Sequence, residues 1–114
     1  MIKVAFNLLY SQGYICRAGV KEDGREVVAA RAQERRAKGQ PVSGAVFCNA
    51  ADIESRGPDG AYPLYFGRPA TEKFGKLGKT DLEIGCDVVR AIKAAGGWCE
   101  WDGDPTHAIT VKEN

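Results

Sequence analysis

The stretch that decides the fold is TDLEIGCDVVRAIKAAGG, residues 80–97. Thr80 followed three residues later by Glu83 forms a capping box, in which each side chain bonds a backbone N–H at the start of a helix. Apolar residues then recur at helical spacing, and two glycines end the pattern. These apolar residues are Ile84, Val88, Val89, Ile92 and Ala95. The stretch therefore predicts an amphipathic helix over residues 80–95 whose apolar side packs on a sheet.

A hairpin follows this helix. Residues 98–101 and 108–111 have the composition of two strands, and Asp102-Gly103 opens the turn between them. His107, the only histidine of the chain, stands just before the second strand. Asp and Gly are the residues that such turns require, which is one explanation of the pattern. The alternative is that Asp102 orients the imidazole of His107 for binding or catalysis.

Three further strands are expected upstream of the helix. Residues 44–48 form a short apolar run bounded by turn residues, which is typical of a buried strand. Residues 62–66 follow the turn sequence Gly57-Pro58-Asp59-Gly60 and can pair with that strand. Because Pro63 has no N–H to donate, it is expected at an edge, a strand start or a bulge. Residues 14–20 also indicate a strand.

Two more helices complete the prediction. Residues 25–38 are rich in strong helix formers, Asp23 is a candidate N-cap, and Gly39 ends the segment. Its apolar stripe is thin, so a surface position is expected. Residues 2–12 fit both strand alternation and a helical face. Residues 50–56 have room for one helical turn.

The order of elements predicts an α+β fold in a single domain over residues 1–114. Hairpins that alternate with helices favour a mainly antiparallel sheet of about five strands, with two to three helices packed on one face. A chain of 114 residues has the usual size for one hydrophobic core.

Composition excludes several classes of protein. The net charge of +1 argues against a protein that binds nucleic acid mainly through phosphates. No apolar run reaches the roughly 18 residues of a membrane span, and the first residues lack the features of a signal peptide, so a cytoplasmic protein is expected. The four cysteines show no C-x-x-C spacing and are expected to be reduced and buried in the core, with no metal or cofactor.

Three segments resemble a family of uncharacterised bacterial domains of unknown function. GAVFCNAAD (residues 44–52) is similar to the family's G-Y-V-F-Y-H-E-Q-D block, and LYFG (residues 64–67) to its L-Y-L-x-Y-G strand. Residues 84–96, the EWDG of residues 100–103 and the ITV of residues 109–111 resemble its closing motif. The opening helix of that family also resembles residues 2–12, which favours a helix there.

The chain departs from the family at polar positions. Its members carry a Cys-Cys-x-x-Cys cluster where residues 21–26 read KEDGRE, and a His-Glu-Gln where this chain has Asn49-Ala50-Ala51. If those groups form a site in relatives, only Asp52 of it remains. The resemblance therefore implies a fold but no chemistry for this chain.

The chain lacks a Walker loop, a dinucleotide-binding glycine motif and a nucleophile elbow. This favours a non-enzymatic binding protein whose partner is another protein; a small inhibitor encoded by a mobile element has this size. The alternative is a small-ligand or degenerate enzyme domain with a pocket near Asp52, Tyr65 and the loop of residues 67–79. Basic residues before position 80 stand against an acidic C-terminal region. The candidate binding residues are Asp52, Tyr65, Arg68, Lys73, Trp101, Asp102 and His107.

Overall fold

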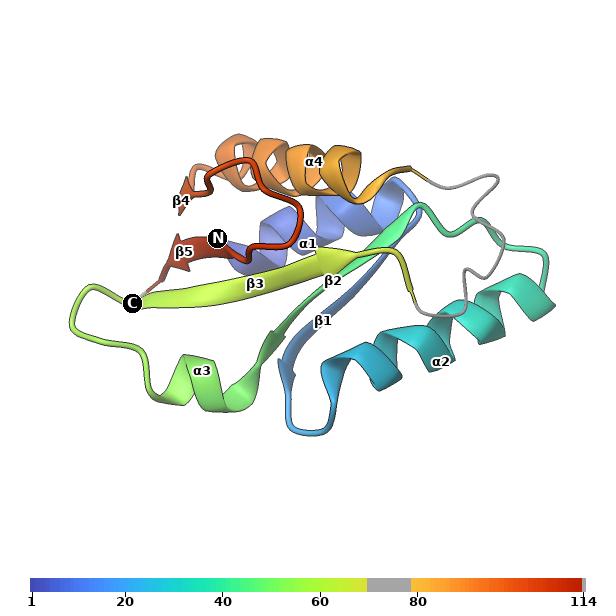
Figure 1. The fold of residues 1–114 in the computed structure, drawn as a ribbon, viewed down its shortest axis with the longest axis horizontal. Helices are drawn as coiled ribbons and strands as arrows, with labels where there is room; N and C mark the ends of the chain where they lie inside the picture. Colours follow the sequence, from blue (N-terminus) through green and yellow to red (C-terminus); the bar gives the residue numbers. More distant parts are fainter. Residues whose placement is uncertain (70–78, 114) are drawn as a thin grey trace.

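The computed structural model describes residues 1–69 and 79–113, and within these ranges it shows four helices and five strands (Figure 1). In chain order they are α1 (Ile2–Ser11), β1 (Tyr14–Val20), α2 (Gly24–Ala37), β2 (Gly44–Asn49), α3 (Ala50–Glu54), β3 (Ala61–Gly67), α4 (Asp81–Ala94), β4 (Trp98–Glu100) and β5 (Ile109–Lys112). The predicted α+β class and the position of each predicted element are confirmed. Asp23 caps α2 through its side chain, and the capping box at Thr80 and Glu83 is formed.

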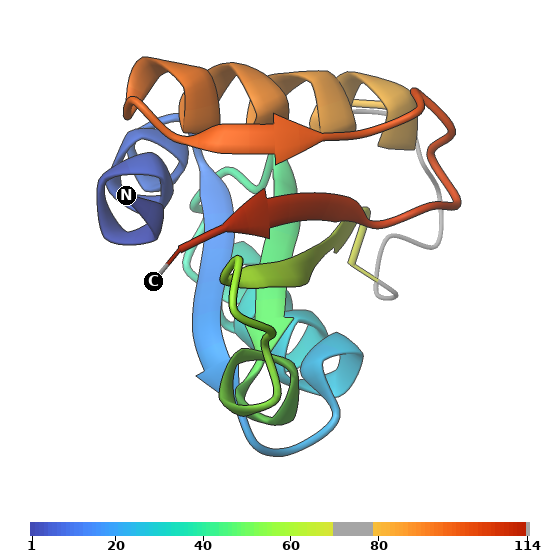
Figure 2. The ribbon, with the colours of Figure 1, turned by 90° about the vertical axis from the view of Figure 1, so that its left-hand side faces the viewer.

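The sheet is mixed, with strand order β1-β2-β3-β5-β4. β2–β3, β3–β5 and β5–β4 are antiparallel, as predicted, but β1 and β2 run parallel (Figure 2). Parallel neighbours need a crossover connection, and α2 provides it. The prediction of a mainly antiparallel sheet is therefore right for three of the four pairs of neighbours and wrong for the first.

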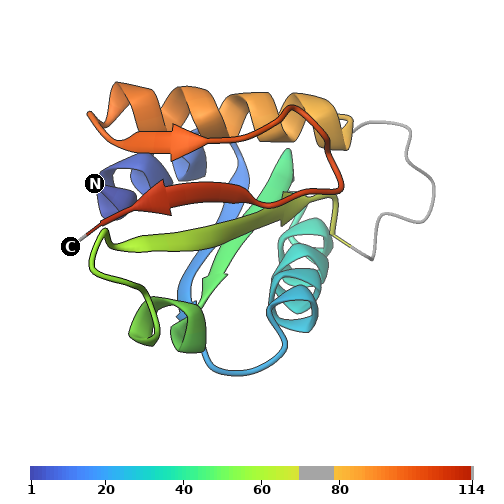
Figure 3. The same cartoon turned by 60° about the vertical axis from the view of Figure 1, so that its left-hand side comes forward.

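Helices cover both faces of the sheet, so the prediction of helices on one face was wrong. α1 and α4 lie on one face and α2 on the other (Figure 3). Neighbouring residues of β1 show this, because Tyr14 is buried against α4 and Ile15 against α2. Successive side chains of a strand point to opposite faces. The run at the start of β2 is apolar on both faces because both are covered there.

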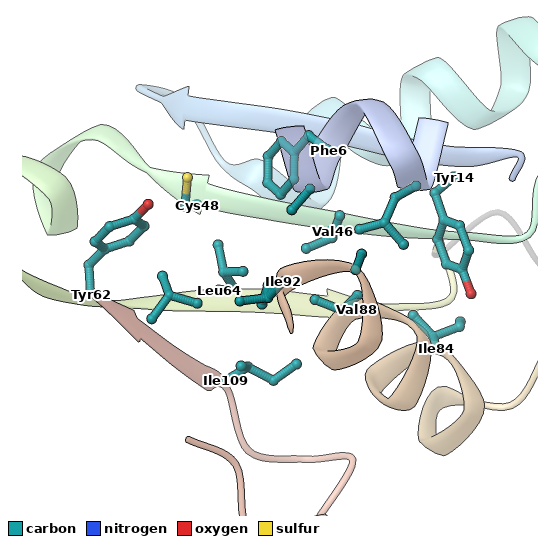
Figure 4. Close-up of a cluster of buried hydrophobic side chains, with 14 residues drawn as sticks. Phe6, Tyr14, Val46, Cys48, Tyr62, Leu64, Ile84, Val88, Ile92 and Ile109 are labelled. Carbon is teal, nitrogen blue, oxygen red and sulfur yellow. The ribbon is translucent and has the colours of Figure 1, made fainter. Parts of the chain in front are cut away.

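The main core lies between the sheet and α1 with α4 (Figure 4). Its buried residues are Ala5, Phe6, Leu9, Tyr14, Val46, Cys48, Tyr62, Leu64, Ile84, Val88, Ala91, Ile92, Ile109 and Val111. The predicted apolar stripe of α4 supplies several of them, and the prediction that this stripe packs on the sheet is confirmed. A second core under α2 contains Ile15, Val20, Val28, Ala32, Ala45 and Phe47.

Two local predictions had different outcomes. All four cysteines are free, but only Cys48 is fully buried, and Cys86 is exposed on α4, so a core position for Cys86 was wrong. Pro63 is the third residue of β3, opposite Thr110 of β5. Because β2 pairs only with residues 65–67 of β3, the other side of β3 is unpaired at Pro63. An interior strand therefore accepts a proline there.

Candidate functional site

A groove lies on the α2 face of the sheet and consists of two adjoining hollows. The first hollow has a volume of about 550 Å³ and the second about 430 Å³. Arg25, Phe47 and Tyr65 line both hollows, so these three side chains form the middle of the groove. The groove is a concave surface with an aromatic middle and polar ends, and such a surface is where a ligand is first expected.

The groove exists because α2 covers only part of this face. α2 packs against β1 and β2, whereas no described helix covers the same face of β5 and β4. The part of this face that α2 leaves uncovered begins between β2 and β3, where Phe47 and Tyr65 are cross-strand neighbours. Their rings stack with centroids 5.4 Å apart at an interplanar angle of 27°. Together they give the groove an aromatic floor.

Gly24 makes room for this floor at the start of α2. A Cβ atom at Gly24 would lie 2.2 Å from Cε2 of Phe47, closer than side-chain carbons approach one another. The absence of a side chain therefore lets the helix start lie directly on the ring of Phe47. A larger residue would displace the ring that separates the two hollows.

The first hollow lies where the parallel strands β1 and β2 end. The turn from β1 to α2 forms one wall, and the start of α3 forms the other. Asp52 lies in the second wall and accepts a hydrogen bond from Nδ2 of Asn49 at 3.3 Å. Asp23 lies in the first wall, and its carboxylate accepts the backbone N–H of Arg25 at 3.0 Å. The charged lining residues are Lys21, Glu22, Asp23, Arg25, Asp52 and Glu54.

The second hollow lies between α2 and the ends of β3 and the β4–β5 loop. Arg68 lines it, and its Nε donates to the carbonyl of Lys79 at 3.0 Å. The backbone N–H of Arg68 donates to Asp81, which also lines this hollow, at 2.9 Å. His107 completes the rim from the β4–β5 loop. Arg25, Arg68 and Asp81 are the fully charged side chains in the described lining of this hollow.

Trp101 and Asp102 shape the β4–β5 loop and do not line either hollow. The Nε1 of Trp101 donates to the carbonyls of Asp104 at 2.9 Å and His107 at 3.2 Å. The Trp101 ring packs edge-on against Phe66 and lies over Gly85, where a Cβ would come within 2.6 Å of it. Asp102 accepts a hydrogen bond from the Nδ1 side of His107, with an Oδ2–Nδ1 distance of 2.6 Å. Trp101 therefore holds the backbone of this loop, and Asp102 holds the imidazole of His107.

The imidazole of His107 is expected to titrate above its ordinary pKa of about 6.5. The hydrogen bond to Asp102 raises the pKa first, and the charges of Asp102 and Asp104 add to it. This interaction stabilises the fold below the unfolded-state pKa and is lost as the pH rises through the higher folded-state pKa. Because the chain has one histidine, NMR of its ring protons follows the titration directly.

Two variants check the cause of this shift. Asp102→Asn is expected to return the pKa of His107 toward its ordinary value. Asp104→Asn is expected to have a smaller effect, since the Nε2–Oδ2 distance is 3.8 Å against 2.6 Å for the bond to Asp102. An unchanged pKa in the Asp102→Asn variant would contradict the assignment.

The structure brings four of the seven predicted site residues to one groove. Asp52 lines the first hollow, Arg68 and His107 line the second, and Tyr65 lines both. Lys73 and most of the predicted loop of residues 67–79 lie outside the described residues. Phe47 and Arg25 also line the groove but were not predicted as site residues, because Phe47 was assigned to a buried strand and Arg25 to a solvated helix. One feature of the sequence could have indicated this site. Phe47 stands near the end of β2, and ligands often bind at the carboxyl ends of strands that a crossover makes parallel.

A second polar cluster, also missed, lies at the edge of the main core, outside the groove. The carboxylate of Asp87 on α4 accepts hydrogen bonds from the hydroxyl of Tyr14, from Nζ of Lys79 and, at 2.9 Å, from Arg90. Burial tends to raise the pKa of Asp87, but the bonds from Lys79 and Tyr14 and the two cations lower it overall. Burial, followed by the bond to Asp87, raises the pKa of Tyr14, which stays protonated. The cluster joins β1 to α4 and has a structural role.

No group of three or more His, Cys, Asp and Glu side chains in residues 1–69 and 79–113 is arranged to hold a metal ion. Among the helices of these same residues, none combines the length and apolar character of a membrane span. The candidate site is the groove, because the stacked rings of Phe47 and Tyr65 and the charged lining residues meet there.

Comparison with known proteins places the chain in context. The model of a family described as Domain of unknown function (DUF6891) matches residues 2–114. No curated protein and no solved structure gives a match. The resemblance to a family of unknown function is confirmed over nearly the whole chain, and that family brings no assigned activity.

Proposed function

The chain belongs to the family Domain of unknown function (DUF6891), which has no assigned activity. We therefore propose a function from the groove itself, namely that it binds a peptide segment of a protein partner. The observation that carries this proposal is the arrangement of the two hollows on either side of the Phe47–Tyr65 stack. Such a site offers an apolar contact in the middle and polar contacts at both ends. An extended peptide has this alternation of apolar and polar groups.

The aromatic floor supplies the anchor of the site. Tyr65 is only partly buried, so its ring has surface left for a ligand, while Phe47 beneath it is 8% exposed and holds it in place. Rigid aromatic side chains of this kind carry much of the binding energy at protein interfaces. A small number of anchored contacts surrounded by polar groups is the usual composition of a protein-binding site.

The rims favour a peptide over a compact charged ligand. The first hollow is lined by charges of both signs, and so is the second. A phosphate or a nucleotide would need one dominant cluster of cations in one place. The lining offers no such cluster among the described residues. Peptides carry both signs of charge on one chain and match this pattern.

Replacing Tyr65 by serine is expected to abolish most of this binding. The protein is used to select from a displayed library of random peptides of about twelve residues, which span roughly 40 Å when extended. Synthetic versions of the enriched peptides are then titrated by fluorescence anisotropy. Loss of the anchor ring is expected to raise the Kd of the Tyr65→Ser variant at least about tenfold, as for an interface hot spot.

A matched control is available on α1, outside the groove. Tyr10 is 59% exposed and lines neither hollow, and its ring lies against the guanidinium of Arg35, so Tyr10→Ser removes an equal ring from outside the site. This variant is expected to keep the wild-type Kd, and circular dichroism checks that both variants are folded. Equal loss of binding in both variants, or no loss in Tyr65→Ser, would exclude the groove as the binding site.

A further inference from the structure

The charge of the described lining residues differs between the two parts of the groove. Arg25 lines both hollows and lies at the boundary between them, and apart from it the first hollow has four carboxylates and one cation, Lys21. On the other side of Arg25, the described lining of the second hollow has Arg68, the carboxylate of Asp81 and the imidazole of His107, which becomes cationic on protonation. Among the described residues, the first hollow therefore carries an excess of negative charge, whereas Arg25 and the second hollow together carry an excess of positive charge.

Several of these charges have no partner in the parts of the chain that the structure describes. The carboxylates of Glu22 and Glu54 receive no hydrogen bond or ion pair from residues 1–69 and 79–113. The guanidinium of Arg25 likewise has no partner within these ranges. Asp81, in contrast, already accepts the backbone N–H of Arg68. Among the described residues, the groups without a partner are thus acidic in the first hollow and basic at the boundary with the second.

From this polarity we infer that the groove binds a peptide in one direction. A basic side chain of the peptide lies in the first hollow near Asp52 and Glu54. An acidic side chain lies in the second hollow near Arg25 and Arg68, and an apolar residue between them rests on Tyr65. This inference rests on the proposed peptide-binding function and adds the chemical class and the orientation of the ligand.

The reversed orientation is disfavoured because it brings like charges together. An acidic side chain in the first hollow would face the carboxylates of Glu22, Asp52 and Glu54. A basic side chain in the second would face two guanidinium groups. Complementary charges raise specificity, and repulsion of the wrong arrangement adds to it. Arginine also bonds a carboxylate through two parallel N–H groups, which fixes the position of the acidic side chain.

A pair of synthetic peptides tests the direction. One carries the consensus selected by the wild-type protein, and the other carries the same sequence with its basic and acidic residues exchanged. Both peptides have acetylated and amidated ends, so that only side chains are charged. The wild-type protein is expected to bind the consensus peptide about tenfold more tightly than the exchanged peptide, the size of effect that like-charge contacts produce.

Charge reversal of the protein provides the decisive comparison. The double variant Glu54→Lys with Arg68→Glu keeps the net charge and is expected to prefer the exchanged peptide. The single variant Arg68→Glu is expected to lose affinity for the consensus peptide. Lys3→Glu makes the same change in net charge on the exposed side of α1 and is expected to leave the preference unchanged.

The outcomes separate this inference from the proposed function. If enriched peptides depend on Tyr65 but bind equally well in both charge orders, peptide binding stands and the inference on direction is overturned. If Lys3→Glu shifts the preference as much as Arg68→Glu, the effect is one of net charge and the inference is also overturned. If no enriched peptide depends on Tyr65, the proposed function itself fails.

Discussion

Replacing Asp87 by alanine is expected to lower the free energy of unfolding by about 3 kcal/mol. The side chain is buried in the main core and is the shared acceptor for Tyr14, Lys79 and Arg90. Its loss leaves the buried hydroxyl of Tyr14 without its partner and removes the link between β1 and α4. Urea unfolding followed by circular dichroism measures the change. A small α+β protein has only about 5–15 kcal/mol of stability, so the effect is large.

Two further measurements identify the cause of this loss. Tyr14→Phe leaves Asp87 with both cations and is expected to cost about 1 kcal/mol, the value of one hydrogen bond. Because the pKa of Asp87 is lowered in the fold, its contribution is present above its unfolded-state pKa of about 3.9 and is lost as the pH falls through the folded-state pKa. The difference between wild type and Asp87→Ala should therefore shrink in acid. A difference that persists below the folded-state pKa would point to packing as the cause.

Replacing Ile92 by alanine is expected to destabilise the protein by about 3 kcal/mol, within the 2–5 kcal/mol found for large-to-small changes in cores. Ile92 is fully buried between α4 and the sheet and contributes to the main core (Figure 4). The neighbouring side chains lie on rigid elements and cannot fill the cavity completely. Thermal or urea unfolding measures the change, with the slope of the urea transition as a check that the unfolded state is the same.

A residue on the same helix serves as the control. Leu82 is 47% exposed in the first turn of α4, so Leu82→Ala removes a similar aliphatic group from the solvent side. Its expected effect is within about 0.5 kcal/mol. Similar losses in Ile92→Ala and Leu82→Ala would contradict the orientation of α4, since the apolar stripe would then not face the sheet.

Local signals predicted the elements well. The capping box and the recurring apolar residues located α4, because both are set by contacts three and four residues apart. Residues 2–12 were ambiguous, because alternate positions and helical positions were both apolar there. Only the similarity to a known family favoured the helix that the structure shows as α1.

Strand direction could not be predicted from the same signals. The residues of a strand show which of its faces are buried but not whether its neighbour runs parallel. The relevant feature was the connection: β1 and β2 are separated by a helix, which is typical of a parallel crossover. The apolar run of β2, buried on both faces, pointed the same way. Helices on both faces follow from that crossover.

The candidate site was predicted in part. Tyr65 and Asp52 were expected near one pocket, and both line the first hollow. Arg25 was missed because it lies on a helix whose charged residues are mostly in solvent, and its position beside the groove depends on tertiary packing. Asp87 was missed although it stands three residues after Ile84, within the apolar stripe of α4. A carboxylate at such a position indicates a buried partner.

The place of β5 in the sheet has a consequence for synthesis on the ribosome. β5 is the last of the five strands along the chain, yet in the sheet it lies between β3 and β4 and pairs with both of them. Until Ile109 and Val111 have left the exit tunnel, β4 has no strand to join and the floor beneath α4 is incomplete. The nascent chain therefore cannot complete this half of the sheet until β5 has emerged from the ribosome.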